Sequence, residues 1–214
     1  MDNSLTYYTV ASVIEAFILW LYCNKLFKQR LNTPLSILIA IIMHLLSAPV
    51  YMLHFPILNI ISFILITYIV TIIISDISFF SAIFHSLMLT VVMGLSELLV
   101  VGFVPNLYIL FFRESGTINN TALYVFISKT IYLFISQAVS TILKKRKGSY
   151  PFSDKSTLFL SIIPATSIII MLCLCFICIS IPLTSKVNAY SSVSILLLLA
   201  INMFTFYMQQ IIVR

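Results

Sequence analysis

The sequence predicts an all-α membrane protein, a polytopic bundle of about seven transmembrane helices with six as the alternative count. Three observations predict this fold class. Hydrophobic residues make up 61% of the 214 residues and charged residues only 8%, with a mean hydropathy of +1.13, which is too little charge for the surface of a soluble domain. The apolar stretches have the length that crosses the hydrocarbon layer. Lys and Arg collect in alternate gaps between these stretches.

The first four stretches are bounded by residues that are typical of helix ends and membrane interfaces. Trp20 and Tyr22 close the first one at a headgroup boundary. Pro34 suits the first turn of the second, and the short turn at 54–56 makes the second and third an antiparallel hairpin. A polar excursion over 102–120 follows the fourth.

The fifth stretch ends in a run of four basic residues, and Pro164 interrupts the sixth, where it removes one backbone hydrogen bond and predicts a kink. A static bend and a hinge both remain open. We expect one sensor-like domain, 1–214, with spans at about 5–23, 34–53, 56–75, 79–101, 121–143, 156–181 and 190–213.

The distribution of basic residues predicts the orientation. Only Arg113 and Lys186 fall in gaps on one side, and Lys129 lies within a span. The other nine of the twelve Lys and Arg residues lie on the opposite side: Lys25, Lys28, Arg30, Lys144, Lys145, Arg146, Lys147, Lys155 and Arg214. Because cytoplasmic loops are enriched in Lys and Arg, we expect the N-terminus outside and the C-terminus in the cytoplasm.

Several classes of function are disfavoured by the sequence. The formal charge of +6 comes from residues beside spans, where they face anionic lipid, so we expect no nucleic-acid partner. Cys173 and Cys175 would point about 160° apart on a helix, so a metal site is not expected, and packing is the preferred role of Cys175 and Cys178. No phosphate-binding loop, zinc motif or paired carboxylate motif occurs. We expect neither a cofactor nor an enzyme.

Ionisable side chains within spans are costly and are therefore candidates for function. Glu15 and His44 both lie about midway through adjacent antiparallel spans, so we expect an intramembrane polar pair. Two roles remain open for this pair. Glu15 serves as a hydrogen-bonded link between helices, or it takes part in ligand or proton binding.

Glu97 and Lys129 lie at similar depths in the fourth and fifth spans, on the side predicted to be outside. An ion pair between them would border an outward-facing cavity, together with Arg113 and Glu114 of the connecting segment. We expect these four residues to bind a ligand. The alternative is that Glu97 and Lys129 extend separately toward the headgroups.

The last span carries polar residues on one face, which in a membrane indicates a face turned toward protein. Asn202, Thr205 and Gln209 continue a stripe that begins at Ser191 and Ser194. Interhelical hydrogen bonding explains the stripe, and so does a helix that couples the bundle to a cytoplasmic partner.

A family resemblance rests on short local features. Ile14-Glu15-Ala16-Phe17, followed by Leu21-Tyr22-Cys23-Asn24-Lys25-Leu26-Phe27, resembles the opening span of AgrC-like sensor histidine kinases with a GHKL-type ATPase domain. Ser96-Glu97, the basic end of the fifth span and the polar seventh span extend the resemblance along the chain. It implies a homodimeric bundle that senses an extracellular peptide. The phosphoacceptor His and the ATPase domain of that family are not present in these residues.

The sequence therefore predicts the sensor module of a two-component signalling histidine kinase in a bacterial plasma membrane. Its partners would be the lipid bilayer and an extracellular peptide or small hydrophobic ligand, and the last helix would carry the signal inward. The alternative is a small-molecule transporter or the substrate-binding membrane subunit of one, with Glu15 and His44 as substrate or proton sites.

The predicted orientation can be measured with reporter fusions. A green fluorescent protein fused after Arg214 should fluoresce, because it folds in the cytoplasm, and alkaline phosphatase at the same position should be inactive, because its disulfides need an oxidising compartment. The reverse result is expected for fusions at Gly116. An active phosphatase after Arg214 would contradict the orientation.

Overall fold

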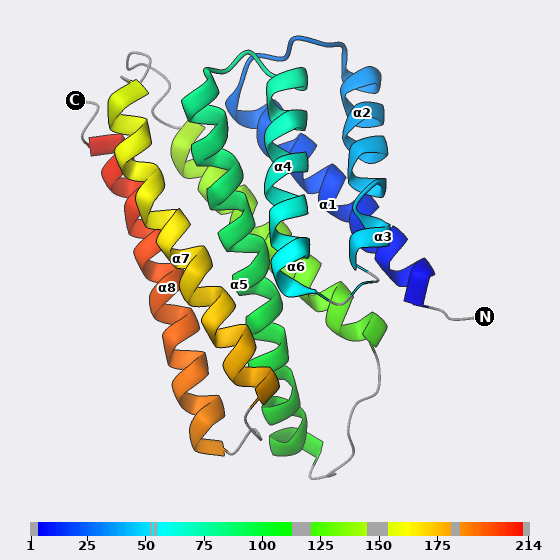
Figure 1. Ribbon diagram of the computed structural model, residues 1–214, viewed down its shortest axis with the longest axis vertical. Helices are drawn as coiled ribbons and strands as arrows, with labels where there is room; N and C mark the ends of the chain where they lie inside the picture. Colours follow the sequence, from blue (N-terminus) through cyan, green and yellow to red (C-terminus); the bar gives the residue numbers. More distant parts are fainter. Residues whose placement is uncertain are drawn as a thin grey trace.

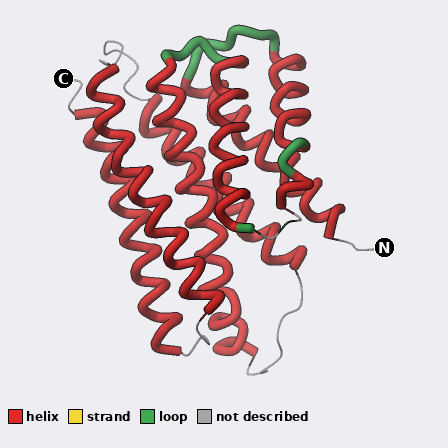
Figure 2. The backbone as a smooth tube through the Cα atoms, in the orientation of Figure 1, coloured by secondary structure: helices red, strands yellow, loops and turns green. Residues whose placement is uncertain are grey.

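A computed structural model of the chain shows an elongated bundle of helices (Figure 1). It describes residues 4–51, 53, 55–112, 121–144, 154–180 and 185–211. This part of the chain contains helices and connecting loops and no β-strand (Figure 2). The helices are α1 (Ser4–Leu26), α2 (Thr33–Leu45), α3 (Ala48–Tyr51), α4 (Pro56–Ile74), α5 (Phe79–Phe112), α6 (Thr121–Lys144), α7 (Asp154–Ser180) and α8 (Ser185–Ile211).

The predicted all-α membrane class is confirmed at the level of the helices. Six helical segments in the described residues are long and apolar enough to cross a membrane: Thr6–Leu26, Thr33–Tyr51, Pro56–Ile74, Phe79–Val101, Leu123–Ile142 and Thr157–Phe176. Helix α7 continues through Pro164 without interruption. The predicted second span corresponds to α2 and α3 together, and α5 extends beyond the predicted fourth span.

The predicted second span is not one continuous helix. Helix α2 ends at Leu45, and the short α3 begins at Ala48. Pro49 explains the break, because it has no N–H to donate to the carbonyl of Leu45 and its ring crowds that carbonyl. Ser47 stabilises the interruption, since its hydroxyl and its backbone N–H both donate to the carbonyl of His44.

Helix α5 is longer than the predicted fourth span. It continues through Pro105 to Phe112 and so includes much of the excursion expected from residue 102 onward. The apolar sequence of 107–112, Leu-Tyr-Ile-Leu-Phe-Phe, explains why the helix continues beyond the proline. The predicted polar loop begins later than expected.

Helix α5 is the centre of the packing and the most deeply buried of the six candidate spans. It contacts α4, α6, α7 and α8, and it lies between them in Figure 1. Residues between 84 and 93 of α5 join a core with α1, α2, α4 and α6 that includes Leu19, Ala40, Phe63, Phe84 and Tyr132. Residues between 91 and 98 join another core with α7 and α8 that includes Leu95, Met171, Ile195 and Leu198.

The outer surface of the bundle is apolar. Phe126, Phe134 and Phe159 are 66%, 70% and 73% exposed, a pattern that suits contact with lipid chains and not with water. Inside the bundle, many hydroxyls of Ser and Thr donate hydrogen bonds to backbone carbonyls of their own helix. In α5, Thr90 donates to the carbonyl of Ser86 and Ser96 to that of Val92, which is the usual solution for Ser and Thr in a membrane helix.

The loops that follow α1 and α4 lie at the same end of the bundle and are hydrogen-bonded to each other. The backbone N–H of Arg30 donates to the carbonyl of Ile74 at 2.9 Å, and that of Asp76 donates to Lys28 at 2.8 Å. An exposed Arg30–Asp76 ion pair of 3.3 Å lies beside them. The basic residues after α1 therefore share one end of the bundle with the start of α5.

Gly94 marks a close approach of α5 to α7. A Cβ atom added at this position would overlap the side chain of Met171, which is fully buried in the second core.

We expect Gly94→Val to lower the free energy of unfolding by roughly 1–3 kcal/mol through overpacking, measured by thermal or denaturant unfolding in detergent. Gly94→Val with Met171→Ala should recover part of this loss. Equal stability of wild type and Gly94→Val would contradict overpacking and show that the Met171 side chain moves aside at no cost.

Candidate functional site

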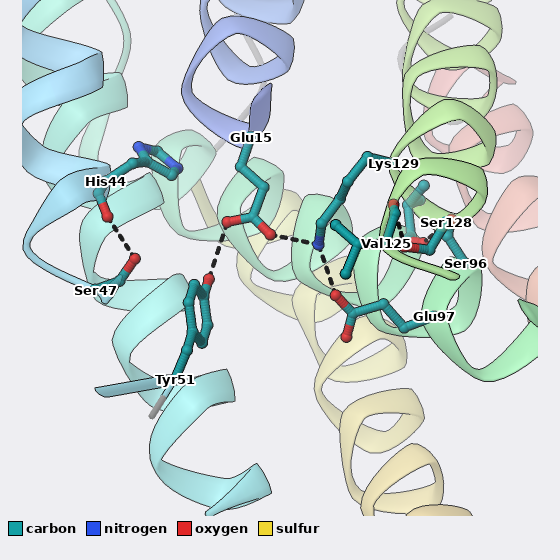
Figure 3. A network of polar contacts seen from close by, with 10 residues as sticks. Glu15, His44, Ser47, Tyr51, Ser96, Glu97, Val125, Ser128 and Lys129 are labelled. Carbon is teal, nitrogen blue, oxygen red and sulfur yellow. Dashed lines mark hydrogen bonds and ion pairs between the residues drawn. The ribbon is translucent and has the colours of Figure 1, made fainter. Parts of the chain in front are cut away.

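Three charged side chains from three helices meet inside the bundle (Figure 3). The Nζ atom of Lys129, on α6, lies 2.5 Å from Oε1 of Glu15 on α1 and 2.6 Å from Oε1 of Glu97 on α5. We call Glu15, Glu97 and Lys129 the Lys129 triad. With both carboxylates ionised, the triad carries one net negative charge.

The three members of the triad differ in exposure. The side chains of Glu15 and Lys129 are 1% and 5% exposed, whereas that of Glu97 is 49% exposed. Removing an ion from water is costly unless its partner and hydrogen bonds replace the lost hydration. Glu15 and Lys129 therefore depend on each other, while Glu97 keeps access to the space beside it.

A tyrosine completes the coordination of Glu15. The hydroxyl of Tyr51 donates to Oε2 of Glu15 at 2.9 Å, so both oxygens of this carboxylate have a partner. Tyr51 is the last residue of α3 and is held there by the break in the second span. Analysis of the sequence alone missed this residue, although Pro49, two positions before it, is a signal of the break.

The triad lines a cavity of about 390 Å³. Its other walls come from the first half of α1, the start of α4, the middle of α5, the start of α6 and the C-terminal half of α7. All of these lie toward the end of the bundle opposite the Arg30–Asp76 ion pair (Figure 1). Apolar residues dominate the lining, and Tyr8, Tyr51 and Tyr124 contribute aromatic rings.

The predicted pairing of Glu15 with His44 is not the contact that the structure shows. The triad and Tyr51 provide the partners of Glu15, and Nδ1 of His44 lies 3.0 Å from the carbonyl of Ala40 on its own helix. The His44 ring packs edge-on against Phe63, and its Nε2 is buried with no partner among the described residues. Lys129 is the stronger partner because it supplies a full opposite charge at hydrogen-bond distance.

The structure places the remaining predicted site residues as follows. Glu97 and Lys129 form the predicted ion pair at a cavity wall. Arg113 and Glu114 lie outside the described residues. Asn202 and Thr205 are buried, and the amide of Asn202 donates to the Ser167 hydroxyl of α7 at 2.8 Å. Gln209 lies on α8, but its side chain is outside the described part.

Two further polar contacts connect α1 to its neighbours at the basic end of the bundle. The Tyr22 hydroxyl lies 2.7 Å from Nδ1 of His85 on α5. The ammonium of Lys25 donates to Thr141 and to the side chain of Gln137 on α6. Sequence analysis missed both contacts, because nothing in the local pattern pairs residues so far apart along the chain.

The described residues contain no group of three or more His, Cys, Asp or Glu side chains placed to hold a metal ion. Cys23 is buried, 3.8 Å from the hydroxyl of Thr71. Cys173 is exposed on the outside of α7, and Cys175 lies at the cavity. Cys178 has no described side chain. The site is therefore defined by its charges and its apolar walls.

Comparison of the chain with protein-family models, with curated proteins and with solved structures found no match. The resemblance to AgrC-like sensor kinases therefore stays a prediction.

Removal of the Lys129 charge should destabilise the protein. We expect Lys129→Met to cost about 3–5 kcal/mol, because it leaves a buried carboxylate without its counter-charge. Adding Glu15→Gln should recover most of the loss, and adding Glu97→Gln should recover less, since Glu97 is partly exposed. Thermal unfolding of the purified variants measures these differences.

Arg30→Met, which removes an exposed ion pair, serves as the control and should change stability by less than about 1 kcal/mol. Equal recovery by Glu15→Gln and Glu97→Gln would contradict the unequal burial of the two carboxylates.

Proposed function

We propose that this chain is a ligand-sensing module of a bacterial plasma membrane, the membrane part of a two-component histidine kinase. It recognises an extracellular peptide or small hydrophobic molecule in the cavity beside the Lys129 triad. The observation that carries the proposal is this cavity, bordered by Glu97 and Lys129. It lies at the end of the bundle that the distribution of basic residues predicts to be outside.

The proposal includes a seventh span and the orientation with the N-terminus outside. Helix α8 runs from Ser185 to Ile211, with an apolar stretch at Val193–Thr205, and packs against α5 and α7. Seven crossings carry the chain from outside to inside. Lys25, Lys28 and Arg30 then face the cytoplasm, and α8 ends on the same side.

The same packing suggests how binding reaches α8. Met171 lines the cavity and belongs to the core that also contains Ile195 and Leu198 of α8. The Asn202–Ser167 hydrogen bond joins α7 and α8 farther along. A ligand that moves Met171 would therefore change the packing between α7 and α8, and a packed core responds to such a change by shifting between discrete arrangements. Dimerisation through the bundle is part of the proposal by family resemblance.

A second candidate, a small-molecule transporter or its substrate-binding subunit, is favoured by one observation. Glu15 is the twelfth of the 23 residues of α1, so the triad includes a buried carboxylate at mid-length of a membrane helix. Intramembrane ion pairs at such depth often belong to substrate or proton pathways. The two candidates differ in whether the bound molecule crosses the membrane.

Three measurements separate these candidates: ligand binding, the movement of α7 relative to α8, and the flux of the ligand across the membrane. The purified chain in lipid nanodiscs is screened against peptides and small apolar molecules for ligands that raise its unfolding temperature. When such a ligand is bound, the distance between nitroxide labels at Ile169 of α7 and Ile201 of α8, both lipid-exposed, should change. Pulsed electron–electron double resonance measures this distance. Labels at Phe134 and Ile142, both on α6, are the control pair and should keep their distance.

The same ligand should show no protein-dependent flux into liposomes that contain the chain. Flux that disappears in Glu15→Gln would support the transporter and contradict the sensor.

A further inference from the structure

The charges and hydrogen-bond acceptors of the cavity define the ligand more narrowly than its volume does. Lys129 supplies the only basic side chain among its described lining residues, and Glu15 and Glu97 supply two acidic ones. The Lys129 ammonium is shared between Oε1 of Glu15 and Oε1 of Glu97. Lys129 is therefore already neutralised, and it is poorly placed to recruit an anion.

The carboxylate oxygen of the triad that has no hydrogen-bond or ion-pair partner among the described residues belongs to Glu97. Both oxygens of Glu15 have partners, one from Lys129 and one from Tyr51. Oε2 of Glu97 receives no hydrogen bond or ion pair from the described residues, and its side chain is half exposed at the cavity wall. Figure 3 shows this oxygen without a dashed contact, on the side of the carboxylate that faces away from Lys129.

Asn59 of α4 also lines the cavity, but its Oδ1 is fully covered by protein and has no partner among the described residues. The acceptor that an occupant of the cavity meets is therefore the carboxylate of Glu97, whose side chain is half exposed. A charged acceptor in an apolar wall favours an occupant with a positively charged N–H donor.

The remaining lining suits the same occupant. Tyr8 and Tyr51 lie with their ring centroids 6.2 Å apart, and Tyr124 adds a third ring. Aromatic faces attract ammonium and guanidinium groups, and the apolar walls accommodate a hydrophobic body. A bare metal cation is a poor fit, because hard cations take six or more oxygen ligands.

We propose that the cavity binds an organic monocation, a primary ammonium or guanidinium group attached to an apolar body. The cationic group pairs with Oε2 of Glu97 and neutralises the excess negative charge of the triad. This inference rests on the proposed function, in which the cavity is the ligand site, and adds the charge of the ligand. The amine of a small molecule and the N-terminal amine of an apolar peptide supply the same chemistry.

Three indole compounds that differ in charge test whether the cavity prefers a cationic ligand. Tryptamine (cationic), tryptophol (neutral) and indole-3-acetate (anionic) are titrated into the wild-type chain in phosphatidylcholine nanodiscs by calorimetry, with empty nanodiscs subtracted. Leucyl-leucinamide with its amine free or acetylated tests the peptide source. Tryptamine or the free dipeptide should bind at least about tenfold more tightly than its uncharged counterpart, the range expected for a charge-assisted hydrogen bond.

Glu97→Gln should remove this preference, because the amide keeps the shape and loses the charge. Asp76→Asn is the matched control: it makes the same chemical change in an exposed residue at the other end of the bundle and should leave the preference intact. A loss of preference in Asp76→Asn would assign it to the overall charge of the protein and overturn the inference.

Other outcomes separate this inference from the proposed function. The proposal of a cationic ligand is overturned if tryptophol binds as tightly as tryptamine. It is also overturned if both cationic probes fail to bind the wild type at millimolar concentration. A neutral ligand that still shifts α7 against α8 without flux would leave the sensor standing. Cationic binding accompanied by flux would support the ligand class and overturn the sensor.

Discussion

The constraint on which the structure depends is the neutralisation of Lys129 inside the bundle. An ammonium that is 5% exposed is tolerable only if carboxylates replace its hydration shell. Two helices supply them, one from each side, so α1, α5 and α6 are fixed in register at this level. The Tyr51 hydroxyl extends the arrangement to α3. Four segments distant in the sequence thus converge on one positive charge, and the cavity exists where this polar centre prevents the apolar side chains from closing together.

Helix α5 determines how this centre relates to the rest of the bundle. One set of its residues, between 84 and 93, packs with α1, α2, α4 and α6, and another set, between 91 and 98, packs with α7 and α8. Glu97 lies between its neighbours Leu95 and Leu98 of the second core. The charged centre and the packing of the last two helices therefore share one rigid element. Side-chain hydroxyls along α5 bond to their own helix. Packing, the ion pair of Glu97 with Lys129 and the contact of His85 with Tyr22 therefore hold α5 against its neighbours.

Composition and the lengths of the apolar stretches were sufficient to predict a bundle of membrane-length helices and most helix limits, because hydrophobicity and length are local properties. The approach of Glu97 to Lys129 was also predictable from depth along adjacent spans. Three features were not. The break at Pro49 was overlooked within an apolar run, and the extension of α5 depended on residues beyond Pro105. The choice of Lys129 over His44 as the partner of Glu15 depends on how α1 packs against α6, which pairwise reasoning about consecutive spans does not reveal.

The unequal lengths of α4 and α5 have a consequence for the surrounding lipid. These helices are neighbours, yet they contain 19 and 34 residues, which correspond to roughly 28 Å and 51 Å at 1.5 Å per residue. A hydrocarbon layer of about 30 Å matches the first and is far exceeded by the second. Helix α5 is enclosed by its neighbours, so it must tilt or project beyond the hydrocarbon layer. Helices α7 and α8, which pack against α5, contain 27 residues each and are also longer than α4, so membrane thickness acts unequally on the side of the bundle formed by α7 and α8 and on the side formed by α4.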